Sequence, residues 1–146
     1  MEDWTMTLEE VKKYLFPERQ FLRASWLHES FNKVIQLIDS TSILSVYYKN
    51  LVDEDKNPIL YFFTENKIFY VEFNAQTKGV KLEMYKIQNI QKIAFNTGLQ
   101  YQTELIIEII NSEPIKLNSN DVNADWIGIY SDDILKIGGM LISCIK

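Results

Sequence analysis

The chain has few of the residues on which several protein classes depend. Its 146 residues include one cysteine, one histidine, three prolines and five glycines. The single cysteine, Cys144, cannot form an internal disulfide, so nothing favours an oxidised, secreted framework. Basic residues number 15 against 20 acidic ones, which gives a formal charge of −5. Nucleic-acid binders usually carry a basic footprint, and this balance therefore predicts no nucleic-acid partner.

Long apolar runs are also missing. The most apolar stretch, Ile134–Ile145, contains Lys136 and is shorter than the about 18 residues that a membrane span needs. Met1–Trp4 is acidic and lacks the basic-then-apolar order of a signal peptide. These features predict a soluble, cytoplasmic protein. The abundance of Ile, Asn and Lys fits an AT-rich bacterial genome.

Apolar residues make up 47% of the chain and aromatic residues 13%, enough for one folded core. The first part is helical. Thr7–Glu10 has the pattern of a capping box, and the helix that it begins ends at Pro17. Apolar residues then recur at three and four positions through Glu18–Asp39, which predicts a second helix with one apolar face. Ser40–Ser42 is the expected break.

Between Ile43 and Leu117 the apolar period changes to two, which predicts about seven short strands. The spacing at Glu65-Asn66 is typical of a tight hairpin. The alternation loses its phase near Lys92, which predicts a bulge. We expect Tyr101–Ile110 to be the longest strand. Val80, Leu82 and Met84 are predicted to share one face of a half-solvated strand, and Leu105, Ile107 and Ile109 to face inward in another.

The end of the chain is predicted to be helical. Ser131 is the expected N-cap, with Asp132 and Asp133 in the first turn. Val122–Tyr130 is left open between a short helix and an irregular connection. Gly138 lies on the predicted packed face, where it would let the helix approach the sheet closely.

This order of strands and a final helix resembles the pleckstrin-homology (PH) superfold, and its bacterial PH-like and GRAM-like branches in particular. Three segments carry the resemblance: Ile59–Tyr70, Met84–Ile93, and Gly98 with Thr103–Ile109. It implies an α+β fold in which a bent, antiparallel seven-stranded sheet or barrel is capped by a C-terminal helix. Residues 41–146 would form this domain, and residues 1–40 a helical extension packed on it. We expect the chain to belong to a small, uncharacterised bacterial family.

Two loops resemble ligand sites without their key residues. Phosphoinositide-binding members of the superfold use a basic first hairpin loop, whereas Asp53–Asn57 holds three acids and one base. Asp121–Asp125 resembles the start of a calcium loop, but Trp126 replaces its glycine and Asp132 its final glutamate. We therefore predict no phosphoinositide ligand and no metal, and interpret Asp121–Asp125 as a turn.

No catalytic constellation is visible. His28 lies within the second predicted helix without evident partners, and Cys144 is predicted to be a small buried apolar residue. The chain has no Gly-rich phosphate loop and no metal-ligand spacing. We predict that it is not an enzyme and carries no cofactor.

Adjacent aromatic residues are the strongest functional indication. In the pairs Tyr47/Tyr48 and Phe62/Phe63, neighbours point to opposite faces of a sheet, so both faces need cover. The N-terminal helices or a partner would provide it. We expect an interaction module that binds a protein or peptide by a sheet edge or aromatic patch, with a homodimer kept open. The alternatives are an NTF2-like pocket protein for a small apolar ligand and a peripheral membrane-associated PH-like domain.

Overall fold

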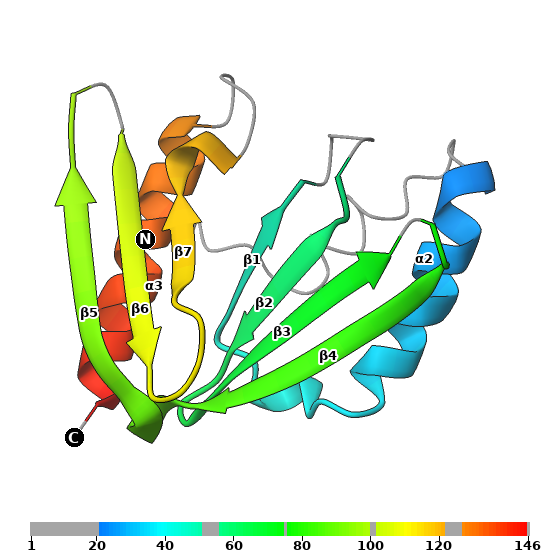
Figure 1. Ribbon diagram of the computed structural model, residues 1–146, viewed down its shortest axis with the longest axis horizontal. Coiled ribbons are helices and arrows are strands. Elements are labelled where there is room, and N and C mark those ends of the chain that lie inside the picture. Colours follow the sequence, from blue (N-terminus) through cyan, green and yellow to red (C-terminus); the bar gives the residue numbers. More distant parts are fainter. Residues whose placement is uncertain (1–20, 51–55, 75, 100–101, 122–126, 146) are drawn as a thin grey trace. The chain divides into compact units, whose positions relative to one another are not determined.

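The computed structural model describes residues 21–50, 56–74, 76–99, 102–121 and 127–145 (Figure 1). These residues contain seven strands, two α-helices and three short 3-10 turns. In chain order they are α2 Phe21–Ile35, η1 Ser40–Ser42, β1 Ser45–Lys49, β2 Ile59–Phe63, β3 Lys67–Asn74, β4 Gly79–Lys86, η2 Ile87–Asn89, β5 Ile90–Thr97, β6 Thr103–Ile109, β7 Ile115–Asn118, η3 Ser119–Asp121 and α3 Ile127–Cys144.

The expected α+β class, with seven antiparallel strands and a C-terminal helix, is confirmed. The described strands form two separate sheets, in the orders β1-β2-β3-β4 and β5-β6-β7, and not a closed barrel. The chain divides into two compact units, which we describe one at a time. The first holds α2 and nearly all of the four-stranded sheet. The second holds the three-stranded sheet, α3, and the hairpin tip Glu65–Ile68.

In the four-stranded sheet, β1 pairs antiparallel with β2, and β2 turns into β3 through Thr64–Asn66. The predicted hairpin at Glu65-Asn66 is therefore confirmed. β4 forms an edge of this sheet. Met84, which is predicted to share a face with Val80 and Leu82, is 46% exposed. An edge strand has a neighbour on one side only, and its apolar residues are correspondingly less covered.

The helix α2 covers one face of this sheet. Phe31 of α2 and Phe62 of β2 are fully buried, and their ring centroids lie 6.5 Å apart. Phe62 pairs with Val46 across the sheet, while Phe63 lies on the opposite face and is also fully buried. Both members of each aromatic pair, Tyr47/Tyr48 and Phe62/Phe63, are buried. Residues 1–20, including the predicted capping box at Thr7–Glu10, lie outside the described residues.

The break after α2 is the turn η1. The Asp39 carboxylate accepts hydrogen bonds from the backbone N–H and the hydroxyl of Thr41, at 3.0 and 2.6 Å. These two bonds stabilise the ionised form and lower the pKa of Asp39 below its ordinary value. The predicted end of the helix at Ser40–Ser42 is confirmed within a few residues.

In the three-stranded sheet, β6 lies between β5 and β7. The register of β5 and β6 shifts between Ile90 and Lys92, which confirms the predicted bulge. Leu105, Ile107 and Ile109 are buried, as expected. β6 has 7 residues, however, and is not the longest strand, since β3, β4 and β5 have 8 each.

The helix α3 begins at Ile127, four residues earlier than its expected N-cap. Ser131 is not an N-cap but a buried residue inside the helix, where its hydroxyl is hydrogen-bonded to that of Thr103 in β6. Asp133 is also buried, and does not lie in an exposed first turn. The prediction was wrong because sequence alone did not show that this turn packs on β6. Residues 122–126 lie outside the described residues.

Two glycines occupy the middle of α3. Gly138 faces β6, and a Cβ built there would lie 3.5 and 3.7 Å from the two Leu105 methyl carbons. Those are ordinary van der Waals distances, so the close approach of helix and sheet does not depend on this glycine. A Cβ at the exposed Gly139 would meet nothing within 4 Å.

We expect Gly139→Ala to raise the free energy of unfolding by about 0.5–1 kcal/mol, because alanine loses less backbone entropy in a helix. Urea denaturation followed by circular dichroism measures the change. Gly98→Ala is the control: this glycine lies outside the helices, and a Cβ there would lie 2.7 Å from Gln102 Oε1, so no gain is expected. A loss of stability in Gly139→Ala would contradict the exposed position of this residue.

Candidate functional site

The face of the three-stranded sheet that packs on α3 is only partly covered. Phe95 of β5 pairs with Leu105 of β6, so the two side chains share a face. Leu105 is buried against Gly138, which identifies that face as the one that α3 covers. Phe95 is nevertheless 42% exposed. The helix therefore covers β6 and leaves the β5 side of the same face open.

Two exposed apolar residues of α3 lie next to its contact with β6. Ser131 and Gly138, which touch β6, belong to one helical stripe with Leu135 and Ile142, at intervals of four, three and four residues. Leu135 is 51% exposed and Ile142 65%. We call the four residues Ile93, Phe95, Leu135 and Ile142 the β5–α3 strip.

β5 is also an edge strand. It pairs with β6 on one side, and no other described strand lies on its second side (Figure 1). An edge presents a row of backbone N–H and C=O groups that can pair with another extended segment. The edge and the β5–α3 strip together offer backbone and apolar contacts side by side.

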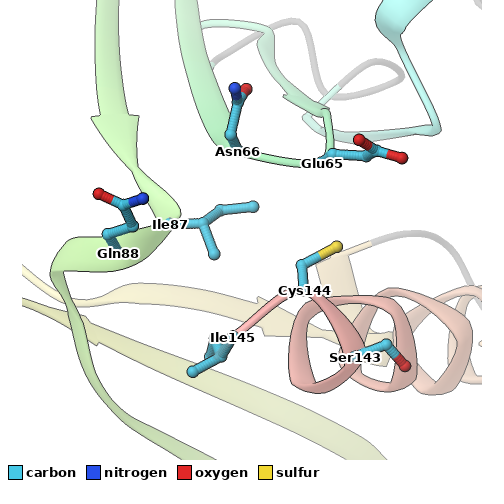
Figure 2. A pocket seen from close by; sticks show the side chains of 7 residues that line it. All are labelled: Glu65, Asn66, Ile87, Gln88, Ser143, Cys144 and Ile145. Atoms are coloured by element: carbon cyan, nitrogen blue, oxygen red, sulfur yellow. The ribbon is translucent and has the colours of Figure 1, made fainter.

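A cavity of ≈ 470 Å³ lies at the C-terminal end of α3. Its described lining comes from three segments, the hairpin tip, η2 and the end of the helix (Figure 2). These residues are Glu65, Asn66, Ile87, Gln88, Ser143, Cys144 and Ile145. The backbone N–H of Ile87 donates to the carbonyl of Asn66 at 3.0 Å, which ties η2 to the hairpin tip. The buried Ile87 side chain projects into the space between the hairpin tip and the helix end (Figure 2).

A second, more open hollow of ≈ 620 Å³ lies beside the turn that joins β6 and β7. Asn111 begins this turn in the left-handed conformation, with φ 58°. Glu108 and Glu113 line the hollow, and both are exposed. Two solvated carboxylates with a turn backbone do not by themselves define a ligand.

In the four-stranded sheet, a polar network joins β3 to the connection after β1. The Tyr70 hydroxyl donates to one Glu72 oxygen, and Asn57 Nδ2 donates to the other at 3.2 Å. Asn50 Nδ2 donates to the Asn57 carbonyl at 3.1 Å. Tyr61 packs beside Tyr70, with ring centroids 5.5 Å apart. The network holds the two ends of the β1–β2 connection, whose residues 51–55, including the predicted acidic loop Asp53–Asp55, lie outside the described residues.

Burial, followed by the hydrogen bond to Glu72, raises the pKa of Tyr70 above its ordinary value. The folded state then keeps a proton that the unfolded state releases above pH of about 10. The stability that Tyr70 contributes is complete below that pH and is lost as the pH rises through and beyond it.

We expect Tyr70→Phe to lower the free energy of unfolding at neutral pH by about 0.5–1.5 kcal/mol, the value of one hydrogen bond. The difference from the wild type should shrink above a pH of about 10, because phenylalanine has no hydroxyl to ionise. Urea denaturation at neutral and alkaline pH tests both effects. A difference that does not shrink above this pH would show that folding does not raise the pKa of Tyr70.

The remaining residues singled out in the sequence have ordinary positions. Asp121 accepts a hydrogen bond from the Asn118 backbone N–H at 2.9 Å, which confirms the turn interpretation for this part of the segment. Asp132 is exposed within α3. Cys144 is predicted to be buried, but it is only half-buried and lines the cavity. His28 lies inside α2.

Within the described ranges, no group of three or more His, Cys, Asp or Glu residues is placed to hold a metal ion. None of the helices in that part of the chain has the length and apolar character needed to cross a membrane. The β5–α3 strip and the cavity were not found from the sequence. Phe95 gave the one available signal, as a large apolar residue in a strand with irregular alternation.

A family model described as "Protein of unknown function (DUF3908)" matches residues 7–131. The match spans both sheets and ends in the second turn of α3. Comparisons with curated proteins and with solved structures found no match.

Proposed function

The chain belongs to the DUF3908 family, and we propose that it is a non-enzymatic, PH-like interaction module of the bacterial cytoplasm. Its ligand is an extended peptide segment of a partner protein, which pairs with the free edge of β5. The single observation that carries this proposal is the exposed Phe95, on the β5 side of a sheet face that α3 covers only at β6.

The strand order supports the PH-like part of the proposal. In each sheet every strand is hydrogen-bonded to its neighbour in sequence, and a helix follows the seventh strand. That is the arrangement which the resemblance in Ile59–Tyr70 and Met84–Ile93 implies.

Peptide addition to a sheet edge uses two kinds of contact. Main-chain hydrogen bonds supply affinity, and pockets for alternate side chains supply specificity. On β5 the free edge would supply the main-chain hydrogen bonds. Ile93 and Phe95, together with the flank of α3, would supply the contacts with the peptide's side chains. A bound peptide would bury the exposed parts of Phe95, Leu135 and Ile142, and each apolar Å² removed from water contributes about 25 cal/mol.

No specific observation favours the pocket-protein alternative. A pocket that performs acid–base chemistry would place a buried acid in its wall, whereas Glu65, the acid among the described cavity residues, is exposed.

The proposal is tested with a displayed library of random 12-residue peptides, selected on the purified full-length protein. We expect Phe95→Asp to weaken the selected peptides by at least about 30-fold, as for the loss of a central interface aromatic. Met84→Asp is the matched control, since Met84 is 46% exposed on β4 and should bind peptides as the wild type does.

Backbone pairing is tested separately by N-methylating alternate residues of a selected peptide. Methylation in one register should abolish binding, and methylation in the other should be tolerated, because alternate N–H groups face the edge. Amide chemical shifts should change along β5. The proposal would be overturned if the selected peptides bound Phe95→Asp with the same affinity as the wild type. It would also be overturned if β5 paired with β5 of a second copy and no peptide could bind.

A further inference from the structure

The β5–α3 strip leads to the cavity at the end of α3. Thr97, at the end of β5, pairs with Thr103, which contacts Ser131 in the second turn of α3. Two residues before Thr97 on β5, Phe95 pairs with Leu105, which lies beside Gly138 of α3. β5 begins at Ile90, directly after η2, whose residues line the cavity. A peptide paired with β5 would therefore reach the cavity at one of its ends.

The described lining of the cavity has the chemistry to hold an organic cation. Glu65 is the one residue among the seven with a formal charge, and it is negative. The last carbonyls of a helix carry a partial negative charge, and α3 ends at Cys144 in the cavity wall. Its last turn contains no basic residue to offset that charge.

The cavity also has an apolar part. Ile87 projects between the hairpin tip and the helix end, and Ile145, directly after the helix, also lines the cavity (Figure 2). Lys and Arg combine an apolar stem with a charged head, and they bury the stem while the head keeps polar partners. A volume of ≈ 470 Å³ is ample for such a side chain.

We propose that this cavity binds a Lys or Arg side chain of the same peptide that pairs with β5. The inference rests on the proposed function and specifies its ligand: an extended segment with an apolar residue against Phe95 and a basic residue about four positions away, on the same face. The spacing follows from β6, where Leu105 and Ile109, the partners of Phe95 and Ile90, lie four residues apart on one face, while β5 has an extra residue at its bulge.

The cavity is tested first without any peptide, using N-acetyl-arginine methylamide as the probe and N-acetyl-norleucine methylamide as its uncharged counterpart. In an NMR titration, the arginine probe should shift the amides of Asn66, Gln88 and Ile145 in a saturable way, and the norleucine probe should not. Glu65→Gln should weaken the arginine probe about threefold to tenfold, and Glu113→Gln, in the β6–β7 turn, should leave it unchanged. Equal responses to the two probes, or none, would overturn the inference.

A double-mutant cycle connects the cavity to peptide binding. In a peptide selected on the wild type, replacing the basic residue by norleucine should cost about tenfold on the wild type and little on Glu65→Gln. Selected peptides that bind β5 without a basic preference would overturn this inference and leave the proposed function standing. If the arginine probe bound the cavity but no peptide could be selected that binds β5, the proposed function would be overturned. The inference that the cation comes from a peptide would then fail as well.

Discussion

Phe62→Ala is expected to lower the free energy of unfolding by about 3–5 kcal/mol, among the largest effects of any single substitution in this chain. Phe62 is 0% exposed and packs against the equally buried Phe31 of α2. Truncation removes the ring from the core and leaves a cavity that its neighbours on β1 and α2 fill only in part. Because domains of this size are stable by about 5–15 kcal/mol, much of the total would be lost.

The change is measured by urea denaturation, with Phe62→Leu as a variant that keeps most of the volume and should lose less. Phe95→Ala is the matched control, because it truncates the same residue type at a partly exposed site. If Phe62→Ala and Phe95→Ala lost similar amounts of stability, the packing of α2 on the four-stranded sheet would be in error.

The second large effect concerns the contact between α3 and β6. Leu105→Ala is expected to cost about 2–5 kcal/mol, since Leu105 is fully buried beside Gly138. Gly138→Leu alone should also be destabilising, by about 1–3 kcal/mol, because the added side chain beyond Cβ meets the Leu105 methyl groups.

Together the two substitutions exchange volume across the same contact. The double variant should therefore lose less than the sum of the single losses, with a coupling of about 1–3 kcal/mol. Gly139→Leu, on the exposed side of the helix, should show no coupling with Leu105→Ala. Additive losses for Leu105→Ala and Gly138→Leu would mean that these residues do not face each other.

Several elements could be predicted because their cause is local. The two-residue spacing at Glu65-Asn66 leaves a hairpin as the simplest path between two alternating segments. The loss of phase near Lys92 requires an extra residue in one strand, and the register shift lies there. Asn118 and Asp121 form their turn with side chains that bond to backbone groups two and three residues away.

The misassigned residues depend on distant contacts. Ser131 has the chemistry of an N-cap, but its hydroxyl bonds to Thr103, 28 positions earlier in the chain. The exposure of Met84 likewise depends on the position of β4 at a sheet edge. Neither partner nor edge is visible in the residues near these positions, and the same is true of the cavity built from Glu65, Ile87 and Cys144.

By itself the sequence determined the class of structure: which segments are strands, where most of the turns fall, and that a helix follows the last strand. These features depend on the period of apolar side chains and on turn chemistry, both of which act within a few residues. Only the tertiary structure decided that the strands divide into two sheets and that α3 lies over β6. The same packing leaves Phe95 uncovered and places the end of α3 at the cavity. Those outcomes depend on which distant surfaces pack together, and the burial of apolar area that drives such packing has no direction along the chain.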